Sequence, residues 1–328
     1  MMSPGPVHSS LIRALVLVLP ILVLASPANA KTPVIGILKW WPCGPEVDGS
    51  PFQNGLRDLG LKPGENVRIE CRSAERQASK LTLAAAELVG LEVDVIVSFS
   101  EPSAKAAYEA TDKIPIVSIF SGDPVASGMA NSISRPGGNV TGVSYYATEL
   151  TGKRLDLLSE AMPEMTTVEV LANPAVSFLP FEEDTKQAAE KLGLAARIHQ
   201  INQPSDLDKA FAKMRTNNAQ AVFVLPDLML ASEASRIADL ALEYNLPTMT
   251  WGAWYVNLGC LLAYSTGYGD HEYRLAFFVD RILKGEMPGD LPIEQPTKYI
   301  LSINLKTAAA LGIDLPQTLL LSADNFIE

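Results

Sequence analysis

The stretches that decide the fold are residues 93–99 (VDVIVSF) and 114–120 (IPIVSIF), two short apolar runs separated by a helical pattern. The second half of the chain repeats this arrangement, with residues 219–225 (AQAVFVL), a helical pattern and residues 246–251 (LPTMTW). Strand-like runs that alternate with helices predict parallel strands joined by crossover helices. Because the unit occurs twice, the sequence predicts an α/β fold with two similarly wound lobes, each a doubly wound parallel sheet.

Further elements of the same kind lie on either side. Strand patterns occupy residues 33–39, 66–71, 140–145, 167–172, 196–201, 260–263 and 298–303, and helical patterns occupy residues 52–59, 80–89, 149–162, 181–192, 206–216, 231–244 and 271–284. The last helix and strand follow a second lobe that is already complete, so the chain is expected to return to the first lobe and cross again. Repeated crossings form a hinge. We expect a first lobe of residues 31–144 plus 267–290 and a second of residues 145–266 plus 291–328.

The first thirty residues have the pattern of a secretory signal peptide. Arg13 precedes an apolar run at residues 14–25 and an A-x-A-like cleavage site that ends at Ala30. The run is shorter than the ~20 apolar residues that a membrane-spanning helix needs, so an N-terminal membrane anchor is the weaker alternative. We expect cleavage after Ala30, export to the periplasm and no stable membrane insertion of the mature chain.

Charge and motif content limit the function classes. The net charge of −11 argues against nucleic acid or an anionic membrane surface as a partner. The sequence lacks the glycine motifs that bind phosphates or dinucleotides, and it lacks the metalloprotease and serine-hydrolase motifs. His199 and His271 have no second ligand at metal-binding spacing. We therefore expect a binding protein without catalytic residues, cofactor or metal.

Polar residues at the ends of the predicted strands are the candidate ligand contacts, because open α/β sheets bind ligands beyond the carboxyl ends of their strands. Ser100 and Ser103 follow the strand at residues 93–99 and open a helix. They are expected either to help bind an anion such as a carboxylate at the helix N-terminus or only to cap that helix. Asp123 follows the next strand, where it either caps a helix or receives a ligand ammonium group.

The second lobe offers matching candidates. Asn173 follows its first strand and Asp227 its third, and Asp227 is the preferred partner of a ligand ammonium group. Trp251, which is followed by Trp254 and Tyr255, predicts either an aromatic wall of the ligand site or packing within the lobe. A carboxylate contact on one lobe and an ammonium contact on the other would close the lobes around an amino acid.

Residues 38–45 (LKWWPCGP) place Trp40, Trp41 and Cys43 in a turn after the first strand. The rings are interpreted as a ligand platform or as a packing plug, and at least one of them is expected to face the ligand, with Trp41 favoured over Trp40. Cys43 and Cys71 lie near the ends of the first two strands, so they either form a disulfide or remain two free thiols. The role of the third cysteine, Cys260, is left open.

Several strings of the sequence match one known family. They are residues 93–97 (VDVIV), 114–117 (IPIV), 122–124 (GDP), 135–144 (RPGGNVTGVS), 281–285 (RILKG), 295–298 (QPTK) and 303–308 (INLKTA). The string RPGGNVTGVS is the most specific of these. From about Val34 to Glu328, the chain closely resembles the ABC-transporter substrate-binding proteins of the tryptophan/phenylalanine-binding type, which have the type I periplasmic binding protein fold.

The resemblance implies an extracytoplasmic receptor that captures a small solute, such as an aromatic amino acid, between two lobes and presents it to an ABC-transporter permease. Residues 40–45 (WWPCGP) and 251–260 (WGAWYVNLGC) depart from the family pattern, and their rings fit a larger aromatic or hydrophobic acid equally well. Two alternatives remain: an exported sensing domain for a membrane receptor kinase and, more weakly, a periplasmic enzyme. By position, the resemblance puts in ligand-facing loops Trp41, Ser100, Ser103, Asp123, Asn173 and Asp227.

Overall fold

The computed structural model describes residues 1–2, 5, 31–44, 50–145, 150–174 and 181–328. The expected signal peptide and its cleavage site therefore lie outside the described residues, apart from three positions at the N-terminus. Residues Pro33–Glu328 form a compact unit of their own, distinct from Met1–Thr32. None of the helices in the described parts of the chain has the length and apolar character that crossing a membrane requires.

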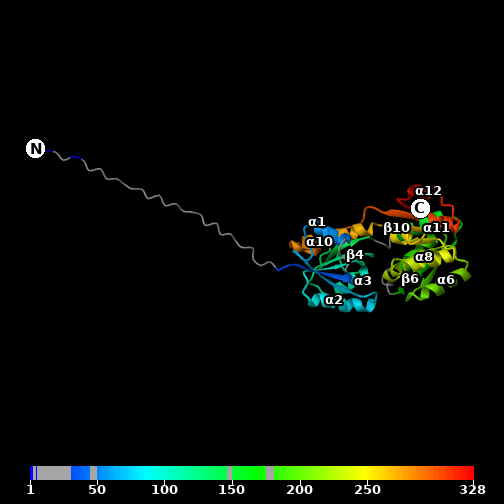
Figure 1. Cartoon of the computed structure of the whole chain (residues 1–328), viewed down its shortest axis with the longest axis horizontal. Helices are drawn as coiled ribbons and strands as arrows, with labels where there is room; N and C mark the ends of the chain where they lie inside the picture. Colours follow the sequence, from blue (N-terminus) through cyan, green and yellow to red (C-terminus); the bar gives the residue numbers. More distant parts are fainter. Residues whose placement is uncertain (3–4, 6–30, 45–49, 146–149, 175–180) are drawn as a thin grey trace. The chain divides into compact units, whose positions relative to one another are not determined.

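The first sheet contains five parallel strands in the order β2-β1-β3-β4-β5. Helices α2 (Leu81–Gly90) and α3 (Glu101–Ala110) cover one face, and α1 (Pro51–Asp58) and α10 (Tyr268–Leu283) cover the other (Figure 1). A short 3₁₀ turn, η1 (Ala78–Lys80), precedes α2. The strands are β1 (Val34–Lys39), β2 (Arg68–Ser73), β3 (Val95–Ser98), β4 (Ile116–Phe120) and β5 (Val140–Ser144).

Both faces of this sheet are buried. Successive side chains of a strand point to opposite faces, so Ile37 shares a buried cluster with Phe52 of α1, while Leu38 shares another with Leu88 of α2. A parallel strand that is covered on both sides has an almost continuous apolar sequence rather than an alternating one. This explains why residues 93–99 and 114–120 are nearly unbroken apolar runs.

The second sheet has the order β12-β11-β10-β9-β8-β6-β7, and β10 and β11 are its antiparallel pair. Its strands are β6 (Thr167–Ala172), β7 (Ala195–Gln200), β8 (Val222–Val224), β9 (Thr248–Thr250), β10 (Leu262–Ser265), β11 (Ile300–Asn304) and β12 (Asn325–Ile327). The helices that belong with it are α4 (Leu150–Ala161), α5 (Phe181–Lys191), α6 (Asp206–Thr216), α7 (Leu228–Ser232), α8 (Ala234–Glu243), α9 (Ala253–Asn257), α11 (Leu305–Leu311) and α12 (Gln317–Ser322).

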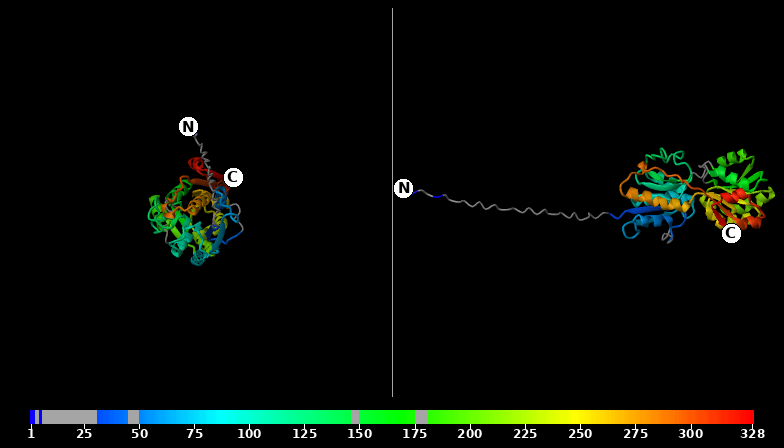
Figure 2. Two further views of the ribbon diagram at one scale, coloured as in Figure 1. Left: turned by 90° about the vertical axis from the view of Figure 1, so that its left-hand side faces the viewer. Right: turned by 90° about the horizontal axis from the view of Figure 1, so that it is seen from above.

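The two sheets share one winding. The order β7-β6-β8-β9-β10 repeats β2-β1-β3-β4-β5, with β6 in the place of β1 and β8 in the place of β3. The expected pair of doubly wound lobes is thereby confirmed, and the two lobes are distinct in the right-hand view of Figure 2. The helix starts at Ser100 and at Asp227 consequently occupy equivalent places in the two lobes.

The prediction of a single helix at residues 231–244 is wrong, because two helices, α7 and α8, lie within residues 228–243. Helix α7 already begins at Leu228, because the Asp227 side chain accepts a hydrogen bond from the Leu230 amide. It ends at Ser232, and α8 begins at Ala234. The apolar spacing continues across Glu233, so periodicity alone did not reveal the break.

The chain passes from one sheet to the other after β5, after β10 and after Glu294. Helix α10 packs on α1 and on β3, β4 and β5, which returns it to the first lobe. The 3₁₀ turn η3 (Pro288–Asp290) follows, and the Glu294 amide donates to the Gly142 carbonyl (2.9 Å) at the edge of the first sheet. Lobe boundaries at residues 144/145, 266/267 and 290/291 remain a prediction.

Gly142, within the RPGGNVTGVS string, has a structural role that no other residue could fill. Its φ is +143°, and a Cβ atom built there would lie 1.9 Å from the Ser118 carbonyl oxygen of β4. A side chain at this position would therefore separate β5 from β4. The most specific string of the sequence thus contains one residue that the packing of the first sheet requires.

Candidate ligand-binding site

A cavity of about 310 Å³ lies between the carboxyl ends of the two sheets. We call it the interlobe cavity. The first lobe contributes residues that follow β1, β3, β4 and β5, and one residue of α10; the second contributes residues that follow β8 and β9. Parallel strands all end at one edge of the sheet, so loops distant in sequence meet there. The lining includes Trp41, Ser100, Glu101, Tyr145, Asp227, Trp251, Trp254 and Glu272.

Aromatic rings form much of the wall. In the second lobe, Trp251 meets Trp254 edge to face with ring centroids 4.8 Å apart, and Trp254 stacks on Tyr255 at 5.6 Å. Trp251 is buried and belongs to the apolar core of that lobe, so it serves packing as well as the cavity. The first lobe contributes the half-buried Trp41. The cavity is therefore suited to a solute with a flat apolar part.

The predicted anion site at the start of α3 is largely occupied by the protein itself. The Ser100 hydroxyl accepts from the Ser103 amide (3.4 Å) and donates to the Ser103 hydroxyl (2.9 Å). Pro102 has no amide hydrogen to offer. Ser100 lines the interlobe cavity, whereas Ser103 is fully buried and is outside its described lining. Ser100 is the N-cap of α3 and Ser103 is its hydrogen-bond partner within the helix, and ligand contact of either serine stays a prediction.

Glu101, the first residue of α3, was missed by the sequence reasoning. Its carboxylate is buried in the cavity wall, with a residue exposure of 1%. Oε2 accepts a hydrogen bond from the Gly122 amide (2.9 Å), while Oε1 has no hydrogen-bond partner among the described residues. Burial raises the Glu101 pKa above its usual range, and hydrogen bonding from Gly122 and from the backbone and side chain of Ser121 opposes that rise. The position of Glu101 directly after Ser100 was the available signal.

Asp227, the preferred ammonium partner from the sequence, is engaged in holding the second lobe. One carboxylate oxygen accepts from the Leu230 amide (2.7 Å) and caps α7, and the other accepts from the Asn173 side-chain amide (2.9 Å). Burial raises its pKa, and these hydrogen bonds lower it. Asp227 lines the cavity, whereas Asn173 lies behind it. Both oxygens therefore have partners before any ligand arrives.

Glu272 and Tyr145 are further lining residues that the sequence reasoning missed. Glu272 lies on α10, which is far along the chain from the other acidic residues of the wall, so no local pattern pointed to it. Burial raises its pKa, and the positive charge of Lys39 opposes this. Tyr145 follows β5 and stacks on the buried His271, with ring centroids 6.2 Å apart. Burial raises the Tyr145 pKa, so its phenol stays protonated at neutral pH.

A second cavity of about 620 Å³ adjoins the first, and the two share Trp41, Phe99, Ser100 and Glu272 in their linings. Trp40 lines only this second cavity and is otherwise buried in the core of the first lobe. Trp40 is thus mainly a packing residue, whereas Trp41 lies where the two cavities meet. The loop that carries both rings is tied to β2.

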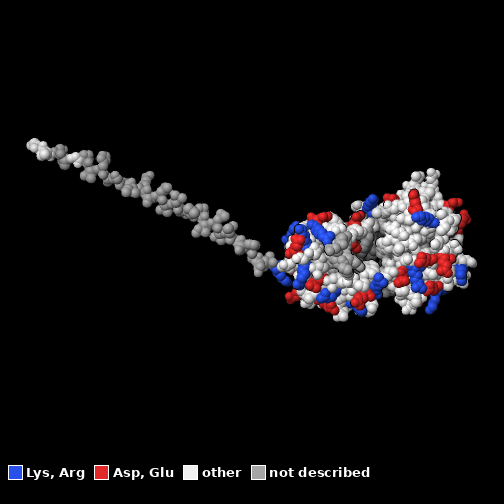
Figure 3. Space-filling model, viewed as in Figure 1, with Lys and Arg blue, Asp and Glu red and all other residues white. Residues whose placement is uncertain are grey.

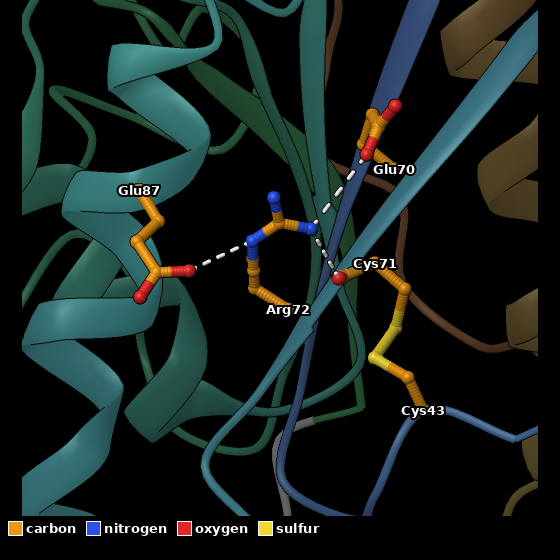
Figure 4. Close-up of a disulfide and its surroundings, with 5 residues drawn as sticks. All are labelled: Cys43, Glu70, Cys71, Arg72 and Glu87. Carbon is orange, nitrogen blue, oxygen red and sulfur yellow. Dashed lines mark hydrogen bonds and ion pairs between the residues drawn. A yellow bond between two sulfur atoms is a disulfide. The ribbon is translucent and has the colours of Figure 1, made fainter.

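That tie is a disulfide between Cys43 and Cys71, with Cα atoms 6.1 Å apart (Figure 4). Next to it, Arg72 donates to Glu87 of α2 (2.8 Å) and to the Cys71 carbonyl (2.8 Å), which anchors this end of β2. The bond restrains the loop two residues after Trp41. The third cysteine, Cys260, is free and buried, and burial raises the pKa of its thiol to about 12.

Asp123 has a local role. Its side chain accepts a hydrogen bond from the Val125 amide (2.7 Å) in the turn after β4, and it is absent from the described lining of both cavities. The residues after Asp123 form a turn rather than a helix, so the expectation that Asp123 caps a helix is wrong, and contact with a ligand ammonium group stays a prediction.

The charges around the interlobe cavity are one-sided. Its described lining contains the carboxyl groups of Glu101, Asp227 and Glu272, and no lysine, arginine or histidine. By contrast, acidic and basic side chains are interspersed over the outer face shown in Figure 3. The lining of the interlobe cavity thus favours a cationic group, whereas the adjoining cavity includes Lys39 and Arg76 in its lining.

Comparison with known proteins agrees with this architecture. Residues 46–327 match the family described as ABC transporter substrate binding protein. A tyrosine-binding protein of Clostridioides difficile (strain R20291) is 28% identical over 275 residues, which cover 84% of this chain and 77% of that protein.

Two solved structures share the fold closely. A conserved domain protein from Vibrio cholerae has a TM-score of 0.80 at 26% identity, with 90% of this chain and 100% of that chain covered. An ABC domain from Streptococcus pneumoniae in complex with L-Trp has a TM-score of 0.80 at 24% identity and the same coverage. The two-lobed fold, the cavity between the lobes and the family match together show that this chain belongs to the ABC transporter substrate-binding protein family.

Proposed function

We propose that this protein captures a small aromatic solute bearing an amine in the interlobe cavity and delivers it to an ABC-transporter permease. The observation that carries the proposal is the cavity itself, whose lining combines Trp41, Trp251 and Trp254 with buried carboxyl groups from both lobes. Rings provide a large apolar contact area, and buried carboxylates select a positive charge. The tyrosine-binding relative supports an aromatic ligand.

The two lobes supply the mechanism of capture. The cavity receives Trp41 from the first lobe and Trp251 from the second, so a ligand that touches both favours the arrangement in which they are close. The chain crosses between the sheets at three places along its sequence, which is the hinge of such a movement. A permease would recognise the ligand-bound arrangement. Binding without chemical change is the role we infer.

Members of this family act outside the cytoplasm, and we propose the periplasm as the compartment. The signal-peptide pattern that ends at Ala30 supports export. The disulfide between Cys43 and Cys71 supports an oxidising compartment, since such bonds rarely persist in the cytosol of a mesophile.

The test is a thermal-shift panel on the mature chain, residues 31–328. It contains L-tyrosine, L-tryptophan, L-phenylalanine, their decarboxylated amines, L-leucine, L-glutamate and glucose. A ligand at 100 times its Kd stabilises a protein by roughly 2.7 kcal/mol, which gives a clear rise in Tm. We expect a rise with aromatic amines or amino acids and none with glucose or glutamate. The proposal would be contradicted if Tm rose only with glucose or glutamate, or if no compound of the panel raised Tm.

A further inference from the structure

We propose that the interlobe cavity binds its ligand by the ammonium group, through Glu101, and that, because its described lining contains no basic side chain to pair with a carboxylate, the preferred ligand class is the aromatic amine rather than the aromatic amino acid. This inference rests on the proposed function and narrows it.

The ionisable side chains of the cavity wall disfavour a bound carboxylate. A zwitterionic amino acid carries its carboxylate within a few ångströms of its ammonium group, so both would enter a lining whose ionisable side chains include Glu101, Asp227 and Glu272 but no basic residue. Like charges at such distances repel strongly where the surroundings are not water. The buried cation Arg154 is close enough to Tyr145 for its charge to oppose the rise of the Tyr145 pKa. Arg154 nevertheless lies outside the described lining, and its Nε donates a hydrogen bond to the Tyr264 carbonyl (2.9 Å).

A carboxylate usually binds at a helix start. At α3, the Ser103 amide donates to Ser100, Pro102 has no amide hydrogen, and a carboxyl group already occupies the first position. At α7, the helix has only five residues and Asp227 caps it. Neither start offers an anion the set of free amides that the sequence led us to expect.

Of the three acidic residues in the described lining, Glu101 is the best acceptor for a ligand ammonium group. Each carboxylate oxygen of Asp227 accepts a hydrogen bond from the protein. Burial raises the Glu272 pKa and the positive charge of Lys39 opposes that rise, so Glu272 already interacts with a cation. Glu101 differs because its Oε1 has no hydrogen-bond partner among the described residues although the side chain is almost fully buried. A buried acceptor without a partner is costly, and a ligand ammonium group would satisfy it.

The aromatic rings of the cavity wall are suited to the rest of the ligand. Trp251 and Trp254 stand edge to face in the wall, and Trp41 stands in the other lobe. Aromatic faces attract both a second ring and a nearby cation. An arylethylamine, which joins a ring to an ammonium group by a short apolar chain, satisfies all of these features at once.

The test is isothermal titration of the mature protein with three compounds that share the indole ring: tryptamine, L-tryptophan and indole-3-propionate. Tyramine, L-tyrosine and 3-(4-hydroxyphenyl)propionate form a second series. We expect the amine to bind at least tenfold more tightly than the amino acid, and the propionate to bind not at all. An amino acid that binds more tightly than its amine would overturn the inference and leave the proposed function standing. Failure of all six compounds would overturn both.

The matched variants are Glu101→Gln and Glu109→Gln, which lie on the same helix. Glu101→Gln keeps the shape of the side chain and removes the charge, so amine affinity should fall about 100-fold, which is the scale of a charge-assisted hydrogen bond. Glu109 is exposed and pairs with Lys105, so its variant should bind the amine like the native protein. Unchanged affinity in Glu101→Gln, or an equal loss in both variants, would overturn the inference.

A second variant covers the case in which Glu101→Gln does not fold. Glu272→Gln changes a half-buried residue of α10 and should lower amine affinity several-fold while the affinity for the propionate stays undetectable. If Glu272→Gln instead improves amine binding, the cavity does not select a cation, and the inference fails.

Discussion

The two walls of the interlobe cavity begin from equivalent strands, yet their acidic groups are used differently. After β3, Ser100 caps α3 and Glu101 follows as the first helical residue, whose Oε1 lacks a partner among the described residues. After β8, Asp227 is itself the cap of α7, and both of its oxygens accept hydrogen bonds from the protein. Asp227, in the capping position, uses its carboxylate to accept hydrogen bonds from its own lobe, whereas Glu101, one residue after the cap, keeps an oxygen that a ligand could bind.

The aromatic residues show the same division. Trp251 in the second wall is buried and joins the core of its lobe, whereas Trp41 in the first wall is half-buried and lies on a loop that a disulfide restrains. Trp251 therefore has a structural role in its lobe, and we propose that Trp41 serves mainly to bind the ligand. Four measurements test whether the two walls differ in this way.

The largest effect is expected for Trp251→Ala. Removing a buried tryptophan leaves a cavity in the core, and the free energy of unfolding should fall by about 3–5 kcal/mol. Trp41→Ala should cost less than half as much in stability and should weaken ligand binding more strongly. Urea denaturation and calorimetric titration of both variants measure these quantities. Equal stability losses would make Trp41 a packing residue.

The disulfide comes next. Closing a loop of 28 residues restricts the unfolded chain, so the double variant Cys43→Ser/Cys71→Ser should lose about 3 kcal/mol of unfolding free energy. Ligand affinity should also fall, because the loop that carries Trp41 is no longer tied to β2. The control is Cys260→Ala, which leaves the bond intact and should keep native affinity. Full affinity in the double variant would show that the bond does not position Trp41.

The third prediction contrasts the two acids. Asp227→Ala removes the cap of α7 and the hydrogen bond to Asn173, so stability should fall by about 1–2 kcal/mol. Asp227→Asn keeps a capping oxygen and should recover most of the loss. Glu101→Gln should be neutral or stabilising, because it removes a buried charge. The comparison fails if Glu101→Gln proves as destabilising as Asp227→Ala.

The smallest effect is expected in the dependence of stability on pH. The folded-state pKa of Glu101 is raised by burial, and Asp123 adds to the rise, so the folded protein binds this proton more readily than the unfolded chain does. As pH falls through the raised folded-state pKa towards the ordinary glutamate value of about 4.3, Glu101 takes up a proton in the folded protein before it does so in the unfolded chain. The free energy of unfolding of the unliganded protein should therefore rise relative to that of Glu101→Gln.

Amine affinity should fall over the same pH range, because the protonated carboxyl group no longer attracts a cation. Denaturation and titration series of both proteins between pH 7.5 and 5 give the two slopes. The neighbouring titratable groups, Asp123 and Tyr145, are present in both proteins and cancel in the difference. Identical slopes in the native protein and Glu101→Gln would mean that Glu101 does not titrate as described.

Much of the fold followed from the sequence for a physical reason. Strands buried on both faces, such as β3 and β4, are continuous apolar runs, and each lies inside the range expected from the sequence. Helix caps were harder to anticipate, because the choice of Asp227 as the start of α7 depends on a single side-chain hydrogen bond.

The site was only partly accessible from the sequence. The edge of the sheets, Trp41, Trp251 and Asp227 were all anticipated as cavity neighbours, although their ligand contacts stay predictions. Glu101 was overlooked because a glutamate at the start of a helix is common for electrostatic reasons alone. Glu272 could not be found locally, since only the return of α10 to the first lobe brings it to the cavity.

The most direct test of the central claim is a crystal structure of the mature protein with tryptamine bound. We predict the indole ring between Trp41 and the pair Trp251 and Trp254, with the ammonium nitrogen about 2.8 Å from Oε1 of Glu101. A ligand outside the interlobe cavity, or one whose ammonium group contacts Asp227 while Glu101 stays without a partner, would contradict the account.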